Sequence, residues 1–461
     1  MFFPSQIVFA AAFAVLVDAA ALSTVTLDYG TFTGLTDTTT GIIYFRGVRY
    51  ADPPVGDLRW RAAVSPPTTP LGNVNATTFG DACIATSQTA ATSSTSEDCL
   101  FGNVYIPIST TASSALPVLI YFYGGGFESG SSNGFAPENL LQPSTEPLIF
   151  VTFNYRLGQF GFLSGTPVHD DGLLNAGLLD QGDSPSLSFL PHYNDTFAEN
   201  LFAQFAGFAG CSGTGSAIMA CLRAAPTNTL ALAGSQILAN RSSSFFPLAP
   251  IADGSFIQER PVEAFRSGNF ARVPVLFGQV HVKCANWCQG LANPAANTAN
   301  PNANETTVYN CIAGQFSTFT TESYQTALTL YPLADYNNSF QLQGQQMYGE
   351  MRYICSALLI TGAAQNFRYG GLSIPLGQSW ANSDLQPRRG AVIDAMRLYF
   401  TSFATSGAPV AANSAAWTPS ADINGSPRIL LHPSEVAMEN ITDALAARCD
   451  FWHGLSSEIN T

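Results

Sequence analysis

Residues 116–127 read LPVLIYFYGGGF, an apolar run that leads directly into three glycines. A run of this length and composition predicts a buried β-strand. The glycines that follow lack a Cβ, so their backbone N–H groups can come close to a reacting group. Amides placed in this way stabilise the alkoxide that develops in ester chemistry. The stretch therefore predicts a buried strand that ends in a glycine loop, with Gly125 and Gly126 in it, of the form that an oxyanion hole has.

Short segments on both sides of this loop carry a family resemblance. In chain order with the loop they are YFRG (44–47), ADPPVGDLR (51–59), SEDCL (96–100), GGGF (124–127), NYRLG (154–158) and GLLDQ (177–181). Together they resemble the type-B carboxylesterase family, which includes cholinesterases and secreted fungal lipases. The resemblance continues through VPVLFG (273–278), YFTSF (399–403) and RCDFW (448–452). It implies an α/β-hydrolase fold with a mostly parallel central sheet flanked by helices, a small ester as substrate and no cofactor.

The junction after Gln181 departs from the family. GLLDQ runs straight into GDSPS (182–186), whereas the family has a helix, the central strand, a G-x-S-x-G nucleophile elbow and a further helix at this point. We therefore expect the fold to lack the strand-elbow-helix unit. A buried strand contributes on the order of 10 kcal/mol, close to the whole stability of a typical domain. The chain must then close its sheet in a new register, take support from a partner, or fail to fold.

The other two members of the catalytic triad are also replaced. The resemblance places the acid just beyond a strand at 273–278, where this chain has Lys283, and the base after PLG (375–377), where it has Trp380 or Ala381. A cation cannot orient a histidine, and neither replacement can accept a proton. We expect a catalytically inactive protein that acts through a protein partner. The alternative is an active ester hydrolase whose sequence lacks an internal block.

Other nucleophiles and bases are weaker candidates. GSSNG (130–134) matches the elbow pattern around Ser132, but no apolar strand runs directly into it. Ser184 and Ser186 lie at the junction, and we expect both to be ordinary loop residues. The five histidines occupy none of the family's base positions, and we expect structural roles for them: His169, His192, His281, His432 and His453.

Composition and the N-terminus indicate an extracellular protein. Residues 7–17 are apolar but too few to span a bilayer, and AAA (19–21) follows, so residues 1–21 are predicted to be a signal peptide and 22–461 a single, incomplete carboxylesterase-like domain. The net charge of −14 argues against nucleic acid or an anionic membrane as partner. Six sequons are predicted glycosylation sites, and a seventh at Asn424 is weakened by Pro427: Asn75, Asn194, Asn240, Asn304, Asn337 and Asn440.

Nine cysteines in a secreted chain predict four disulfides and one remaining thiol. The resemblance implies bridges Cys83–Cys99 and Cys211–Cys221. We expect Cys355–Cys449 as a third bridge. The partners of Cys284, Cys288 and Cys311 stay open at this stage. A zinc site at His281, Cys284 and Cys288 is the less favoured alternative, because no fourth ligand is evident and no other metal site is predicted.

Two pairs of charged residues and one helix complete the expectations. Arg46 with Glu97, and Arg156 with Asp180, are predicted to form structural ion pairs. Residues 396–403 place Met, Tyr, Phe and Phe at i, i+3, i+4 and i+7, which predicts a helix with one buried face that ends at Gly407.

Overall fold

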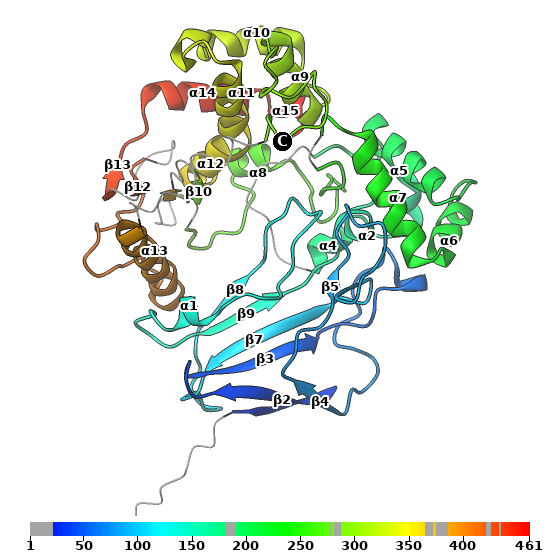
Figure 1. Cartoon of the computed structure of the whole chain (residues 1–461), viewed down its shortest axis with the longest axis vertical. Helices are drawn as coiled ribbons and strands as arrows, with labels where there is room; N and C mark the ends of the chain where they lie inside the picture. Colours follow the sequence, from blue (N-terminus) through cyan, green and yellow to red (C-terminus); the bar gives the residue numbers. More distant parts are fainter. Residues whose placement is uncertain are drawn as a thin grey trace, which may run out of the picture.

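A computed structural model describes residues 22–180, 190–244, 246–276, 278–280, 287–364, 372–374, 386–420, 426–432 and 435–461. For residues 278–280, 372–374 and 386–389 it describes the backbone alone. Two larger sheets, a two-stranded sheet of β5 (Ala82–Cys83) and β6 (Thr95–Ser96), and several groups of helices make up these parts (Figure 1).

The larger sheet has seven strands and is formed by the N-terminal third of the chain. In spatial order its strands are β1 (Thr24–Leu27), β2 (Gly30–Asp37), β3 (Ile42–Arg49), β7 (Phe101–Pro107), β9 (Ile149–Phe153) and β8 (Val118–Tyr121), with β4 (Asn73–Ala76) paired to β2. Pairing is antiparallel from β1 through β9 and parallel between β8 and β9, in the register Val118↔Ile149. Apolar residues cover both faces, with Phe32, Ile43 and Phe45 on one side and Tyr44 and Tyr105 on the other.

The second sheet has four strands from the C-terminal half. They are β10 (Gly278–Val280), β11 (Leu372–Ile374), β12 (Arg428–His432) and β13 (Glu435–Glu439), in that order. The first three run parallel and β13 is antiparallel to β12. The expected single, mostly parallel sheet is thus divided in two, with parallel pairing concentrated on either side of the division. The strand expected at 273–278 begins only at Gly278.

Strand β8 lies at the outer edge of the larger sheet, and this corrects the expectation that it is buried. Val118 is 52% exposed and Ile120 48% exposed, whereas Phe150 on the adjacent β9 is 1% exposed. The reason is that β8 has a partner on one side alone among the described strands. An apolar strand becomes buried only when neighbours cover its edges and faces.

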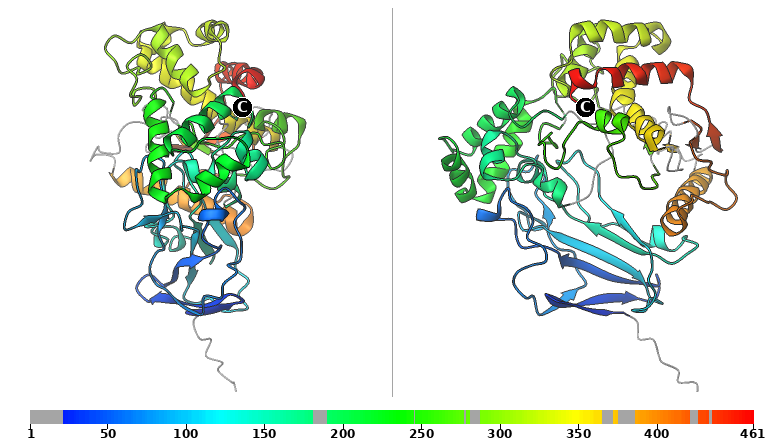
Figure 2. Two further views of the ribbon diagram at one scale, coloured as in Figure 1. Left: turned by 90° about the vertical axis from the view of Figure 1, so that its right-hand side faces the viewer. Right: turned by 180° about the vertical axis from the view of Figure 1, so that it is seen from behind.

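Most of the longer helices form two groups, one beside the larger sheet and one at the opposite end of the molecule. Beside the larger sheet lie α2 (Gly158–Gly161), α3 (Thr166–Asp171), α4 (Ala176–Leu179), α5 (Thr196–Phe208), α6 (Ser216–Ala224) and α7 (Thr227–Asn240), packed around a core that includes Trp60. At the opposite end of the molecule lie α9 (Glu305–Gln315), α10 (Thr321–Leu330), α11 (Phe340–Gly349), α12 (Cys355–Ala363), α14 (Asp443–Gly454) and α15 (Ser456–Ile459), as both views of Figure 2 show. The short helices are η1 (Gly56–Leu58), α1 (Glu138–Leu141), α8 (Pro261–Ser267), η3 (Leu333–Tyr336) and the π-helical turn η4 (Glu350–Ile354).

Helix α13 (Gln386–Ser406) connects the two sheets, because it contacts both β8 and β12. Tyr399 is fully buried and packs with Met396 and Phe400 in a core that includes Ile429 of β12. Gly407 follows the helix with a φ of 74°, a conformation that glycine adopts without strain. The predicted helix and its end are confirmed, whereas its predicted face is buried at Tyr399 and half-buried at Met396, Phe400 and Phe403.

Four disulfides are present among the described residues. Two are the bridges implied by the resemblance, Cys83–Cys99 and Cys211–Cys221, and the third is the expected Cys355–Cys449. The fourth joins Cys288 to Cys311, so the Cys288 sulfur is not available to a zinc ion. His281 and Cys284 lie outside the described residues. None of the described helices has the length and apolar character needed to cross a membrane.

Candidate functional site

The glycine loop follows β8 by two residues and has the backbone form of an anion-binding turn. Gly125 and Gly126 have φ values of 145° and 63°, and Phe127 follows with a φ of 66°. A Cβ on Gly125 would collide with the Ser129 carbonyl, and one on Gly126 with the ring of Phe246. The loop conformation therefore requires glycine at both positions.

Neighbouring segments hold this loop through its carbonyl groups. Glu128 N–H donates to Gly125 O at 3.2 Å, and Gly158 N–H donates to Phe127 O at 2.8 Å. No hydrogen bond between described residues uses the N–H of Gly125 or Gly126 as donor. The two predicted oxyanion donors thus keep their amides available, although no described nucleophile stands opposite them.

A buried ion pair between Arg156 and Asp180 lies close in sequence to Gly158, which holds the loop. The Arg156 Nε and Nη2 donate to the two carboxylate oxygens of Asp180 at 2.7 and 2.8 Å, and Nη1 donates to Arg61 O. Both side chains are buried, so the pair predicted from the sequence is confirmed. It ties the segment after β9 to the end of α4, immediately before the junction.

The second predicted ion pair, Arg46 with Glu97, is wrong, because Glu97 pairs with a different arginine. Glu97 binds Arg59, with Nε to Oε1 at 2.5 Å and Nη2 to Oε2 at 2.8 Å. Arg46 instead stacks over the rings of Tyr44 and Phe79. Arg59 also donates to the carbonyls of residues 223 and 225. Short sequence motifs could not predict these hydrogen bonds, because the partners lie more than 160 residues apart.

Ser132 is a structural residue and does not form a nucleophilic site. It is 1% exposed, accepts a hydrogen bond from Asn103 Nδ2 at 3.0 Å and donates to Asn154 Oδ1 at 3.0 Å. A catalytic serine needs a base within hydrogen-bond reach. Both partners here are amides, which cannot take up its proton.

The four described histidines make contacts that are consistent with structural roles. His453 is buried and its Nε2 lies 2.9 Å from Cys355 O, and burial lowers its pKa. His169 stacks on Tyr193 and contacts Asp170. His192 is exposed and begins the segment before α5, and His432 ends β12. None of these four contacts Ser132 or the glycine loop among the described residues.

The remaining predicted site residues lie outside the described parts of the chain. These are Lys283 at the acid position, Trp380 and Ala381 at the base position, and Ser184 and Ser186 at the junction. Their roles remain predictions.

Two buried charged side chains near the loop were not found from the sequence. Glu128, which follows the GGGF segment, accepts a hydrogen bond from Leu248 N–H at 2.9 Å, and burial raises the pKa of its carboxyl well above the ordinary value. Arg352 stands in the π-helical turn η4 with its guanidinium 5.1 Å from the ring of Phe246. An available signal was a charged residue within the otherwise apolar segment 351–360.

Comparison with known proteins identifies this arrangement. The model of the carboxylesterase family matches residues 21–184 and 183–370, which together form most of the chain. The chain belongs to the carboxylesterase family. The two matched segments meet at residues 183–184, next to the junction after Gln181.

The relatives include fungal lipases of this family. Lipase 1 of Geotrichum candidum is 27% identical over 327 residues, covering 51% of this chain and 58% of the lipase, and Secreted lipase 1 of Botryotinia fuckeliana is 30% identical, covering 51% and 55%. The chain thus matches little more than half the length of these curated relatives. The crystal structure of Aspergillus niger EstA superposes with a TM-score of 0.80 at 24% identity, covering 96% of this chain and 99% of that one, and supports the α/β-hydrolase fold.

Proposed function

We propose that this protein is a secreted, catalytically inactive member of the carboxylesterase family that acts by binding rather than by hydrolysis. The observation that carries the proposal is the free edge of β8. This strand delivers the glycine loop, and β9 occupies one of its edges. A nucleophile strand could face the loop only from the other edge, where no described strand is paired.

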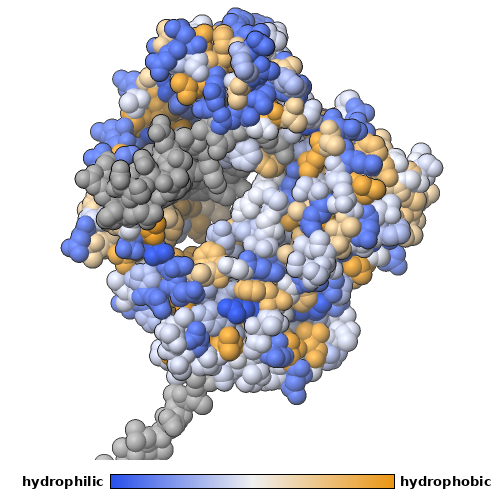
Figure 3. All heavy atoms as spheres, viewed as in Figure 1, coloured by the Kyte–Doolittle hydropathy of each residue, from blue (hydrophilic) through white to orange (hydrophobic). Residues whose placement is uncertain are grey.

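The side chains of β8 support this reading. Val118, Ile120 and Tyr121 are all large, apolar and exposed. Such residues are typical of a strand enclosed by neighbours. Figure 3 shows the molecule hollowed near its centre, between the sheet and the helices opposite. The simplest account is that a strand present in active relatives is missing here.

The alignments with the lipases support a missing block. The match to the Geotrichum enzyme extends over 327 residues and covers 58% of that lipase. It includes only 51% of the 461 residues of this chain, and that share is far smaller than 327 residues. A stretch of the lipase therefore has no counterpart in this chain. The two segments matched by the family model meet at residues 183–184, which is consistent with a missing block at the junction.

A second candidate function is an active carboxylic-ester hydrolase, encoded by a transcript that retains the block. The observation in its favour is the preserved glycine loop, whose strained conformation and available amides serve no evident purpose without a nucleophile. Lys283, Trp380 and Ala381 argue against it, because restoring the block would not restore an acid or a base. Sequencing the transcript across codons 181–182 separates the two: continuous reading excludes the block.

Secretion and glycosylation belong to the same proposal. All six predicted sequon asparagines are exposed, from Asn75 on β4 of the larger sheet to Asn440 after β13. The eight described cysteines are all bridged, as is usual in oxidising compartments. Residues 1–21 would supply the signal peptide, and 22–461 the mature domain.

The test is hydrolysis of a short-chain nitrophenyl ester by the secreted, folded and monodisperse protein. We expect turnover at the background rate, since loss of the nucleophile alone costs a serine hydrolase about 10⁶ in kcat. Ser132→Ala serves as the matched control. Turnover well above background in the wild-type protein would contradict the proposal, and its loss in the variant would identify Ser132 as a relocated nucleophile.

A further inference from the structure

Arg352 is a buried cation that no described carboxylate neutralises. Arg352 is 5% exposed, and its Nε atom has no hydrogen-bond partner among the described residues. No described Asp or Glu lies within ion-pair distance of it. The charge is met by aromatic rings instead, with Phe246 at 5.1 Å and Tyr353 at 5.8 Å from the guanidinium carbon.

This environment is unusual for a guanidinium. Arginine stays charged in proteins, and a buried charge is stable only when it is paired or hydrogen-bonded. Other buried arginines of this protein follow that rule, since Arg59 and Arg156 each hold a carboxylate through two bonds. Among the described residues Arg352 has no carboxylate partner. Against the lowering effect of burial, Tyr348 and Tyr353 are the side chains that raise its pKa in place of one.

The nearest buried acid does not fill this role. Glu128 forms no ion pair with Arg352, and its carboxyl accepts from Leu248 N–H. Burial favours its neutral form, although Arg352 acts in the opposite direction on its pKa. Arg352 therefore keeps the capacity to bind an external anion.

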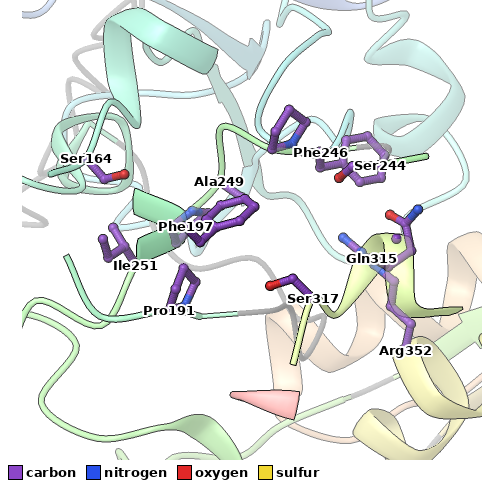
Figure 4. A pocket seen from close by; sticks show the side chains of 13 residues that line it. Ser164, Pro191, Phe197, Ser244, Phe246, Ala249, Ile251, Gln315, Ser317 and Arg352 are labelled. Carbon is purple, nitrogen blue, oxygen red and sulfur yellow. The ribbon is translucent and has the colours of Figure 1, made fainter. Parts of the chain in front are cut away.

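A small cavity lies directly against Arg352. Its volume is about 30 Å³, and its lining includes Arg352, Gln315, Ser317, Phe246, Phe197 and Ser164. Figure 4 shows the Arg352 side chain extending from its helix toward Gln315 and Phe246 on one side of this space. Because a water needs about 10–15 Å³ by this measure, the cavity has room for two or three waters or one very small solute. Ser317 is exposed and marks the side on which solvent meets the cavity.

We propose that this cavity is a binding site for a short carboxylate of the size of formate or acetate, held by the Arg352 guanidinium. The planar fork of arginine matches the two oxygens of a carboxylate, and Phe246 and Phe197 provide apolar surface for a methyl group. Phe246 also packs against Gly126, so an occupied site would contact the side chain that borders the glycine loop. The inference does not depend on catalysis and stands beside the proposed function.

The experiment is a titration of the wild-type protein with ¹³C-labelled acetate, followed by line broadening of the acetate signal at constant ionic strength. A ligand of four heavy atoms is expected to bind with a dissociation constant of the order of 1 mM. Arg352→Gln should weaken binding by about tenfold or more, since it removes hydrogen bonds to a charged group. Arg352→Lys, which keeps the charge and loses the fork, should give an intermediate affinity.

Arg266→Gln is the matched control, because Arg266 is exposed on α8 and the substitution changes the net charge equally. It should leave acetate binding unchanged. The proposal is overturned if the wild-type protein does not broaden the acetate signal, if chloride displaces acetate at equal concentration, or if Arg266→Gln weakens binding as much as Arg352→Gln. Should Arg352→Gln fail to fold, the wild-type titration, the chloride competition and Arg352→Lys still decide the question.

Discussion

The two sheets differ in how completely their strands are enclosed. In the larger sheet, β3, β7 and β9 each have neighbours on both edges and apolar residues over both faces. The smaller sheet has four short strands, and its described core lies around β12 and α13. Each sheet ends in a strand that would be central in a single continuous sheet, β8 in the one and β10 in the other.

This difference teaches that the strands of the larger sheet enclose one another with residues that all precede Gln181. The pairs β1–β2, β2–β3, β3–β7 and β7–β9 are antiparallel and all precede the junction, so this sheet can assemble without the residues that follow Gln181. The parallel strands β10 to β12 need crossover segments and a neighbouring strand, and their support comes from α13 and the disulfide-linked helices. The following predictions test this contrast between enclosed and edge positions.

The largest expected effect is at the centre of the larger sheet. Phe150→Ala on β9 should lower the free energy of unfolding by about 4 kcal/mol, because it removes a fully buried ring that stacks on Tyr105. Ile120→Ala on β8 should cost about 1 kcal/mol or less, because Ile120 is already half exposed. Denaturant unfolding monitored by circular dichroism measures both. Equal losses would mean that a partner or second copy covers β8 in solution.

A smaller effect is expected from the ion pairs. Asp180→Asn should cost about 3 kcal/mol, because it leaves the buried Arg156 guanidinium uncompensated. Glu439→Gln, at the partly exposed Arg428–Glu439 pair between β12 and β13, should cost about 1 kcal/mol or less. Thermal unfolding of both variants beside the wild-type protein provides the comparison. A larger loss for the β13 variant would show that the smaller sheet depends on its charges more than the larger one does.

The smallest effect concerns the pH dependence of the glycine loop. The pKa of Glu128 is raised by burial, so the folded protein binds a proton more tightly than the unfolded chain. This contribution is fully present below the unfolded pKa of about 4.3 and is lost as the pH rises from there through the folded pKa. Glu128→Gln keeps an acceptor for Leu248 N–H and should gain stability relative to the wild-type protein over that rise. Parallel stability curves against pH would contradict the assignment.

Much of the fold could be predicted from local segments. The glycine loop, the Arg156–Asp180 pair and helix α13 follow from short motifs, two of the disulfides follow from the family resemblance, and Cys355–Cys449 was expected from the cysteines that remained. The Arg59–Glu97 pair was missed because Arg46 and Arg59 both lie in family motifs, and only folding decides which cation reaches Glu97. The unusual environment of Arg352 was missed, because it depends on which side chains the fold brings near the guanidinium. The sequence around residue 352 does not show that no described carboxylate lies nearby.

By itself, the amino-acid sequence determined the family and the positions of the sequons, and it predicted the loss of the elbow, the acid and the base, because these depend on residue identity and order alone. Only the tertiary structure decided that β8 lies at an exposed edge, that Ser132 is enclosed by two amides and that Arg352 faces a cavity. The physical reason is that burial and partnership arise from contacts between segments far apart in the chain. An apolar run such as residues 116–123 specifies a strand, but the neighbours available to it determine whether that strand is buried.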